Sequence, residues 1–126
     1  MPLVRIDLPA GRSPEHRKGV ADVVYEAMRA TLDVPDGDRF QVISERAPGD
    51  LLIDPSYLGI TRGPDALIVQ VTLSRGRSVE KKQAFYRAVA EGLQARVGQR
   101  PEDVVINLVE VSPEDWSFGN GIAQYV

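Results

Sequence analysis

Pro2 is the residue of this sequence whose chemistry is most distinctive. Removal of the initiating methionine would leave proline with a free cyclic secondary amine at the chain terminus. A free α-amino group titrates at about 7.7 to 8.0, so partial burial or a nearby cation makes it a base at neutral pH, whereas a nearby carboxylate holds it cationic as an acid. Two interpretations are open: Pro2 is a catalytic amine, or it only begins a strand. A retained Met1 would convert its nitrogen into an inert amide.

Arg75 and Arg77 flank Gly76 at the turn that follows a predicted strand. Guanidinium groups bind carboxylates through paired N–H donors, so two of them at a strand end can form an anion site. The alternative is a solvated turn. Arg77 matches Arg12 in an internal repeat of the chain, which favours a structural role for it, whereas Arg75 lies opposite Ala10 and has no such counterpart.

Asp38 lies where a loop enters a predicted strand, and Asp103 occupies the matching place in the repeat. Twin aspartates at equivalent junctions are most simply local caps. The alternative is that Asp38 tunes the Pro2 amine or orients a water. In the C-terminal tail, Trp116 and Phe118 stand beside glycines, and they form either a plug of the core or the wall of a pocket.

The composition excludes several chemistries. Without cysteine the chain has no disulfide framework, no thiolate nucleophile and no cysteine metal site. Its single histidine, His16, supports neither a catalytic triad nor a histidine-rich metal cluster. We therefore expect no metal and no cofactor.

An internal repeat determines which elements hold these residues. An ungapped alignment of residues 4–45 with residues 69–110 gives 11 identities in 42 pairs, and the matches include Gly11-Arg12-Ser13 with Gly76-Arg77-Ser78. Self-similarity of this kind indicates one supersecondary unit made twice.

Each unit is a strand, a helix and a second strand, within a single domain of residues 1–126. The first unit covers about residues 2–46, a connection covers 47–66, the second unit covers 67–111 and a tail covers 112–126. The patterns predict strands at residues 3–8, 39–46, 66–73 and 104–111, a helix at about 14–31 and a second helix after Ser78. Ser13 and Ser78 are the expected helix caps.

This order predicts an α/β (α+β) fold. Because a helix-containing crossover joins the two strands of each unit, those strands pair in parallel. We predict a four-stranded, mostly parallel sheet with two helices on one face, plus short extra strands, one of them around residues 51–53. The other face of such an apolar sheet would be uncovered, so we expect a homo-oligomer in which sheets pack on neighbouring sheets.

The net charge and the hydropathy pattern argue against two kinds of partner, nucleic acids and membranes. The net charge of −3 argues against a general nucleic-acid binder, which normally carries a basic face. No apolar run approaches the ~20 residues that a membrane span needs, so we expect no membrane segment. No leader pattern opens the chain, which makes a cytoplasmic location the default expectation.

Several motifs together resemble the tautomerase superfamily, and within it the malonate semialdehyde decarboxylase group. The resemblance covers essentially the whole chain: PLVRIDL after Met1, GDRFQVI at Gly37 to Ile43, RGR at Arg75 to Arg77 and EDWSFGNGIAQ at Glu114 to Gln124. It is the order and spacing of these motifs that is specific.

The resemblance implies a homotrimer with its active site at the N-terminal proline. It assigns Pro2 as the catalytic amine, Arg75 and Arg77 as the groups that hold a substrate carboxylate, and Asp38 as an assistant to the proline or to a water. Trp116 and Phe118 would form an apolar wall. The implied activity is keto–enol tautomerisation of small oxo-carboxylic acids, or decarboxylation of the malonate semialdehyde type.

Two other functions stay open. One is a hydratase or dehalogenase of unsaturated or halogenated acids, with Asp38 as its carboxylate, and the other is a non-enzymatic binding or signalling protein. The cis-3-chloroacrylate dehalogenase branch of the superfamily relies on a helix histidine and a C-terminal glutamate. It fits less well, because Arg29 stands near the end of the first predicted helix and His16 lies on its first turn.

Overall fold

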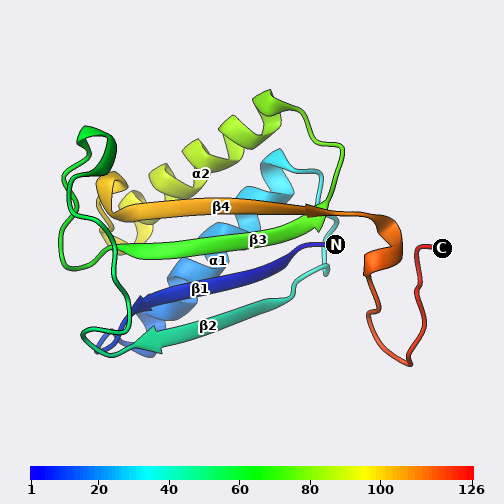
Figure 1. The fold of residues 1–126 in the computed structure, drawn as a ribbon, viewed down its shortest axis with the longest axis horizontal. Coiled ribbons are helices and arrows are strands. Elements are labelled where there is room, and N and C mark those ends of the chain that lie inside the picture. Colours follow the sequence, from blue (N-terminus) through cyan, green and yellow to red (C-terminus); the bar gives the residue numbers. More distant parts are fainter.

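The computed structural model describes residues 1–126 and places two helices on one face of a four-stranded sheet (Figure 1). The strands are β1 (Leu3–Pro9), β2 (Gln41–Arg46), β3 (Leu67–Ser74) and β4 (Val104–Val111). The helices are α1 (Pro14–Thr31) and α2 (Val79–Val97), and single 3-10 turns occur at Tyr57–Gly59, Pro101–Asp103 and Pro113–Asp115.

The sheet order β2-β1-β3-β4 confirms the predicted α/β arrangement. β1 pairs with β2 in parallel, β3 pairs with β4 in parallel, and the two units meet through antiparallel pairing of β1 with β3. In that central pair Val4 lies opposite Val71 and Ile6 opposite Val69, with Arg5 opposite Gln70 between them. Since Val69 and Val71 are the repeat equivalents of Val4 and Ile6, the two units are related by an approximate two-fold axis.

Both helices begin as predicted, at equivalent serines. The Ser13 hydroxyl accepts a hydrogen bond from the His16 N–H at 3.0 Å, and the Ser78 hydroxyl accepts one from the Lys81 N–H at 3.2 Å. Each serine has extended backbone angles and satisfies one of the free N–H groups of a helix start. The second helix ends at Gly98, whose φ of 70° is the left-handed conformation that glycine favours.

The core fills the space between the helices and the sheet. Alternate residues of the two central strands point toward the helices, and all seven of them are buried: Val4, Ile6, Leu8, Leu67, Val69, Val71 and Leu73. The helices approach each other closely at Gly92, where an added Cβ would lie 2.7 Å from a methyl group of Val23. The main hydrophobic core is therefore shared by both units.

The opposite face of the sheet is more polar than the sequence led us to expect. Arg46 and Asp7 form an ion pair across it at 2.7 Å, and the side chains of Gln70 and Asn107 hydrogen-bond at 2.9 Å. Apolar side chains such as Val109 lie among these polar groups and are partly exposed.

The predicted short extra strands are absent. Residues 47–66 contain only the 3-10 turn at Tyr57–Gly59, and residues 51–53 pair with no strand. β2 begins at Gln41, two residues later than predicted, and β3 runs one residue beyond the prediction to Ser74. Neither helix has the length and apolar character to cross a membrane.

Candidate active site

The amino terminus lies at the sheet end where β3 and β4 finish and the tail begins (Figure 1). Pro2 is buried. The Val4 N–H donates to the Phe40 carbonyl oxygen at 2.9 Å, which holds the loop before β2 against the start of β1. Asp38 belongs to that loop, and its carboxylate forms an ion pair with the Met1 α-amino group. The acid and the amino terminus are thus brought together from different parts of the first unit.

Ser74 connects the amino terminus to the C-terminal tail. Its hydroxyl donates to the Met1 sulfur at 3.1 Å and accepts from the Trp116 indole N–H at 3.1 Å. The serine side chain is only 9% exposed, and buried polar groups of this kind are normally hydrogen-bonded. These two contacts place the indole of Trp116 beside the amino terminus.

Arg77 is fixed by backbone carbonyl groups. Its Nε and Nη2 both donate to the Leu32 carbonyl oxygen at 3.1 Å, and its Nη1 donates to the Ser74 carbonyl oxygen at 2.7 Å. A guanidinium has five N–H donors, so two remain to bind a ligand. Arg77 therefore has a structural role at the turn, but not one shared with its repeat counterpart Arg12, which pairs with Asp65, and part of its guanidinium is left free.

Arg75 lies on the outer side of the same turn. Its backbone N–H donates to the Val111 carbonyl oxygen at 2.9 Å, while its side chain makes no hydrogen bond or ion pair within the chain. Arg75 and Arg77 line an open cleft of about 390 Å³ together with Asp33 and Lys81, which pair with each other. With three cationic side chains and one carboxylate, this cleft can attract an anion.

Trp116 and Phe118 form a stacked aromatic pair outside the main core. Their ring centroids are 5.2 Å apart with an interplanar angle of 11°, and Phe118 also contacts Phe40 at 5.4 Å. Both rings line a recess of about 400 Å³, which Leu3, Phe40, Thr72 and Val111 also line. Of the two alternatives for the tail aromatics, the arrangement matches a pocket wall.

The environment of the amino terminus alters its proton affinity. Burial, and after it the charge of the Arg77 guanidinium, lowers the pKa of the Met1 α-amino group from 8.0 to about 6. The Asp38 carboxylate pairs with the same amine and favours its protonated form. The Met1 α-amino group therefore loses its proton at a lower pH than an ordinary α-amino group.

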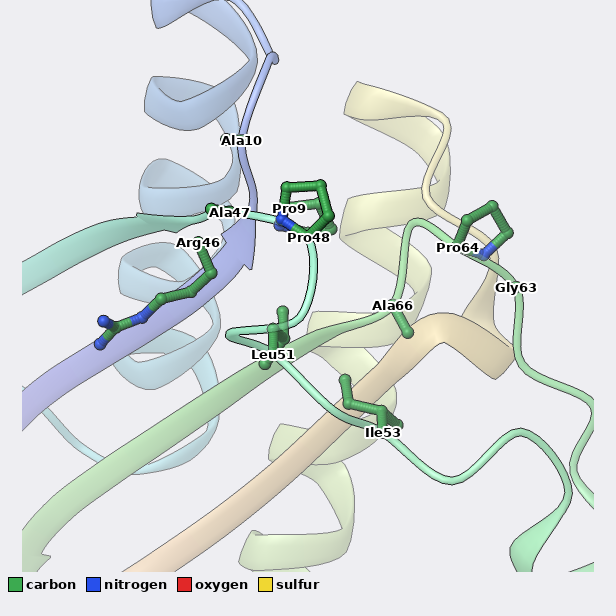
Figure 2. A pocket seen from close by; sticks show the side chains of 10 residues that line it. All are labelled: Pro9, Ala10, Arg46, Ala47, Pro48, Leu51, Ile53, Gly63, Pro64 and Ala66. Atoms are coloured by element: carbon green, nitrogen blue, oxygen red, sulfur yellow. The ribbon is translucent and has the colours of Figure 1, made fainter.

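A different recess, of about 360 Å³, lies at the opposite end of the sheet beneath the connection (Figure 2). Its walls are mostly apolar, from Pro9, Pro48, Leu51, Ile53 and Pro64 among others. Figure 2 shows the Arg46 side chain extending away from Leu51 and Ile53, and its guanidinium is paired with Asp7. No convergent polar groups give this recess a chemical role.

Sequence reasoning missed Ser74 and the Leu32 carbonyl group. A polar residue that ends an apolar strand directly before Arg75 was the available signal for Ser74, since the first unit has Pro9 at the matching place. No pattern pointed to the Leu32 carbonyl, because it is a backbone atom at the end of a helix.

Comparisons with known proteins agree on one family. The family described as "Tautomerase enzyme" matches residues 38–119, and a second family with the same description matches residues 2–60. The chain is 37% identical to the probable tautomerase YusQ of Bacillus subtilis over 126 residues, which covers 100% of this chain and 99% of YusQ.

Two solved structures are also similar over nearly the whole chain. One is FG41 malonate semialdehyde decarboxylase inhibited by 3-bromopropiolate, with 41% identity, a TM-score of 0.91 and coverage of 98% of this chain and 93% of the other. The other is a malonate semialdehyde decarboxylase with 36% identity, a TM-score of 0.91 and coverage of 98% and 95%.

Proposed function

This chain belongs to the tautomerase family of enzymes, and we propose that it acts on small oxo-carboxylic acids through the amine of Pro2. The proposed activities are keto–enol tautomerisation and decarboxylation of a 3-oxo acid of the malonate semialdehyde type. What supports them is the position of the amino terminus, which lies against the Asp38 carboxylate and within the field of the Arg77 guanidinium. The similarity to two malonate semialdehyde decarboxylases supports the choice of substrate class.

Substrate binding depends on the two arginines. Arg75 and the two unused N–H groups of Arg77 hold the substrate carboxylate by charge-assisted hydrogen bonds. Because three donors of Arg77 are already bound to carbonyl groups, its guanidinium has a fixed orientation before the substrate arrives. A fixed clamp holds the reacting carbon at one distance from the amine.

Decarboxylation uses a positively charged Pro2 nitrogen, which is either an ammonium or an iminium group. The protonated nitrogen hydrogen-bonds to the substrate carbonyl oxygen. Alternatively, the nitrogen adds to that carbonyl and the carbonyl oxygen leaves as water, which gives a cationic iminium. The bond to the carboxylate then breaks, carbon dioxide leaves, and its electron pair forms an enolate or enamine that the positive nitrogen stabilises. Protonation of the enolate at carbon completes the first route. In the enamine route, water then hydrolyses the resulting iminium and releases the product from Pro2.

Tautomerisation uses the neutral form of Pro2. The free amine removes a proton from the oxygen or carbon of the substrate and returns one to the other atom. For the Met1 amine, Asp38 favours the cationic form, whereas burial and Arg77 favour the neutral form. We propose that the same groups act on the Pro2 amine once Met1 is removed. The charge that the Pro2 nitrogen carries during the reaction thus separates the two activities.

The aromatic pair contributes an apolar surface. Trp116 and Phe118 line the recess beside the first strand, and a carboxylate that faces aromatic rings loses hydration. Loss of carbon dioxide replaces that charged group with a neutral product, so the wall favours decarboxylation.

Hydration of an unsaturated acid is the second candidate. The Asp38 carboxylate lies close enough to the amino terminus to orient a water molecule there. The similar malonate semialdehyde decarboxylase with 36% identity is described with both decarboxylase and hydratase activities. Turnover of a 3-halogenated unsaturated acid, with halide release, distinguishes this activity from the other two.

The test compares Met1-free wild type with the Pro2→Ala variant, both verified by intact mass. Each is assayed with an enol form of a 2-oxo acid and with malonate semialdehyde at matched pH, and the wild-type Pro2 amine is titrated by NMR. We expect the substitution to reduce both activities strongly, because alanine supplies only a primary amine. Full activity in the variant would reject the role of the proline nitrogen.

We also propose that the chain assembles as a homotrimer, as the family resemblance implies. The partly exposed valines on the open sheet face, Val42 and Val109, support burial against another copy. Light scattering coupled to size-exclusion chromatography measures the mass, and a monomer at micromolar concentration would contradict the proposal.

A further inference from the structure

Ser74 joins three groups of the amino-terminal corner, two through its side chain and one through its backbone. Its hydroxyl contacts the Met1 sulfur and the Trp116 indole, and its carbonyl oxygen accepts from Arg77. Only three polar or charged side chains are buried in this chain, and the other two, Gln99 and Asp103, lie at the far end of the sheet beside the connection. A buried hydroxyl at this corner therefore calls for a specific explanation.

The donor of the Ser74 hydroxyl is directed by its neighbours. A hydroxyl has one donor and two acceptor sites. The Trp116 N–H occupies an acceptor site, and the O–H points toward the Met1 sulfur. Thioether sulfur is a weak acceptor, so the serine donor has a poor partner in this state.

The Met1 residue bridges Asp38 and Ser74. Its amine contacts Asp38 and its sulfur contacts Ser74, and methionine has three carbon atoms between that nitrogen and that sulfur. Removal of Met1 would vacate the space between the Asp38 carboxylate and the Ser74 hydroxyl, which the three carbon atoms between its nitrogen and its sulfur now span. An oxygen atom placed where the sulfur lies would give the serine donor a strong acceptor.

We propose that Ser74 is a further substrate-contacting residue, whose hydroxyl donates a hydrogen bond to an oxygen of a bound three-carbon oxo acid in the Met1-free protein. Trp116 acts on this contact as a positioning residue, because its indole N–H fixes the rotation of the hydroxyl. The identity of the substrate rests on the proposed function, whereas the hydrogen bond to a small carboxylate does not.

The experiment measures binding of malonate, an unreactive three-carbon dicarboxylate, to Met1-free protein by calorimetry. Ser74→Ala should weaken malonate binding about tenfold or more, as expected for the loss of a hydrogen bond to a charged group. Ser74→Thr, which keeps the hydroxyl, should restore most of the affinity. Ser74→Cys, with its weak donor, should fall between them and serves as the second variant if the alanine protein does not fold.

Two controls make the result specific. Ser44→Ala removes a serine hydroxyl from β2, away from the amino terminus, and should leave malonate affinity unchanged. Trp116 is the only tryptophan of the chain, so its emission spectrum reports on the hydrogen bond to Ser74 directly. A shift of that spectrum in Ser74→Ala but not in Ser74→Thr supports the positioning contact.

The outcomes separate this inference from the proposed function. If wild type binds malonate and Ser74→Ala weakens binding, the serine contact stands even if neither oxo acid is turned over, and only the proposed function fails. If Ser74→Ala binds malonate within twofold of wild type, or if wild type does not bind malonate, the serine contact is overturned, whatever the turnover.

Discussion

The Arg77 guanidinium donates two hydrogen bonds of 3.1 Å to the carbonyl oxygen of Leu32, which lies 45 residues earlier in the chain. Leu32 follows the last turn of α1, where helix carbonyl groups lack partners within the helix. The contact ties the end of α1 to the turn that follows β3. Arg77 therefore supports the fold and faces the candidate site, whereas Arg75 has no side-chain partner within the chain.

Substitution of the two arginines should separate these roles. Arg77→Ala leaves the Leu32 and Ser74 carbonyl groups without their donor, so we expect it to lower the free energy of unfolding by about 1–3 kcal/mol and to reduce turnover. Arg75→Ala should change stability by less than about 0.5 kcal/mol and raise KM about tenfold or more. Urea denaturation and steady-state kinetics give the two quantities. Equal stability losses in both variants would refute the assignment of a structural role to Arg77 alone.

Met1 should determine whether the protein is active. In the chain that retains it, the Pro2 nitrogen is an amide and the Met1 amine is paired with Asp38. We expect this form to show no turnover, and we expect removal of Met1 by an aminopeptidase to restore it. Intact mass spectrometry follows the cleavage and an enol substrate follows activity. Comparable turnover before and after cleavage would rule out proline catalysis.

The Met1-retaining form should also show a specific pH dependence of stability. The pKa of its α-amino group is about 6 in the folded protein and 8.0 without these surroundings, because burial and Arg77 disfavour the charge. The unfolded chain therefore binds more protons between these values, and the free energy of unfolding rises with pH across that window. The loss of stability that comes from burying the charged amine is fully present below pH 6 and absent above pH 8.

Chemical denaturation at a series of pH values between 5.5 and 8.5 measures this dependence. Acetylation of the amine removes its titration and is the matched control. A slope that is equally steep in the acetylated protein would assign it to other groups.

Contacts between residues that are close in the sequence could be predicted, whereas individual side-chain contacts between distant residues could not. The Ser13 and Ser78 caps act over three residues, so local patterns revealed them. The parallel strand pairs followed from the helix-containing crossover that joins the two strands of each unit. The contact of Ser74 with Trp116 spans 42 residues and that of Arg77 with Leu32 spans 45, and no periodicity reports such pairs.

The errors had physical causes as well. The extra strand expected around residues 51–53 has no neighbouring strand to pair with, since the sheet ends at β2 and β4. The expectation of an apolar open face rested on the apolar character of the strands as a whole, although Gln70 of β3 alternates with buried neighbours. Its partner across the strands is Asn107, so polar residues pair with one another on that face.

The twin aspartates of the repeat should give opposite results. Asp103 is 2% exposed and its carboxylate accepts from the Gly63 N–H at 2.7 Å, which holds the connection against the second unit. Asp103→Ala should lower stability by about 1–3 kcal/mol, because that N–H loses its partner, while the folded fraction keeps its turnover rate. Asp38→Ala should reduce turnover by tenfold or more with a smaller stability change. Loss of turnover in folded Asp103→Ala would contradict this assignment.

The packing of α1 against α2 should make Gly92 intolerant of a side chain. A Cβ at Gly92 would lie 2.7 Å from Val23 Cγ1, and Val23 is 3% exposed. Alanine is favoured over glycine in a helix by about 1 kcal/mol, whereas overpacking destabilises by about 1–3 kcal/mol. Because the branched valine has few alternative rotamers, the clash should prevail, and we expect Gly92→Ala to lower the free energy of unfolding by about 1–2 kcal/mol.

A double-mutant cycle shows whether that loss comes from the predicted contact. Val23→Ala alone leaves a cavity and should also destabilise the protein. In the combined variant the new methyl group of Gly92→Ala enters the space that Val23→Ala vacates, so the loss should be smaller than the sum of the two single losses. Urea denaturation of all four proteins measures the coupling. Additive losses would place the effect of Gly92→Ala in the helix itself, and a rise in stability for Gly92→Ala alone would show that the helices separate freely at this point.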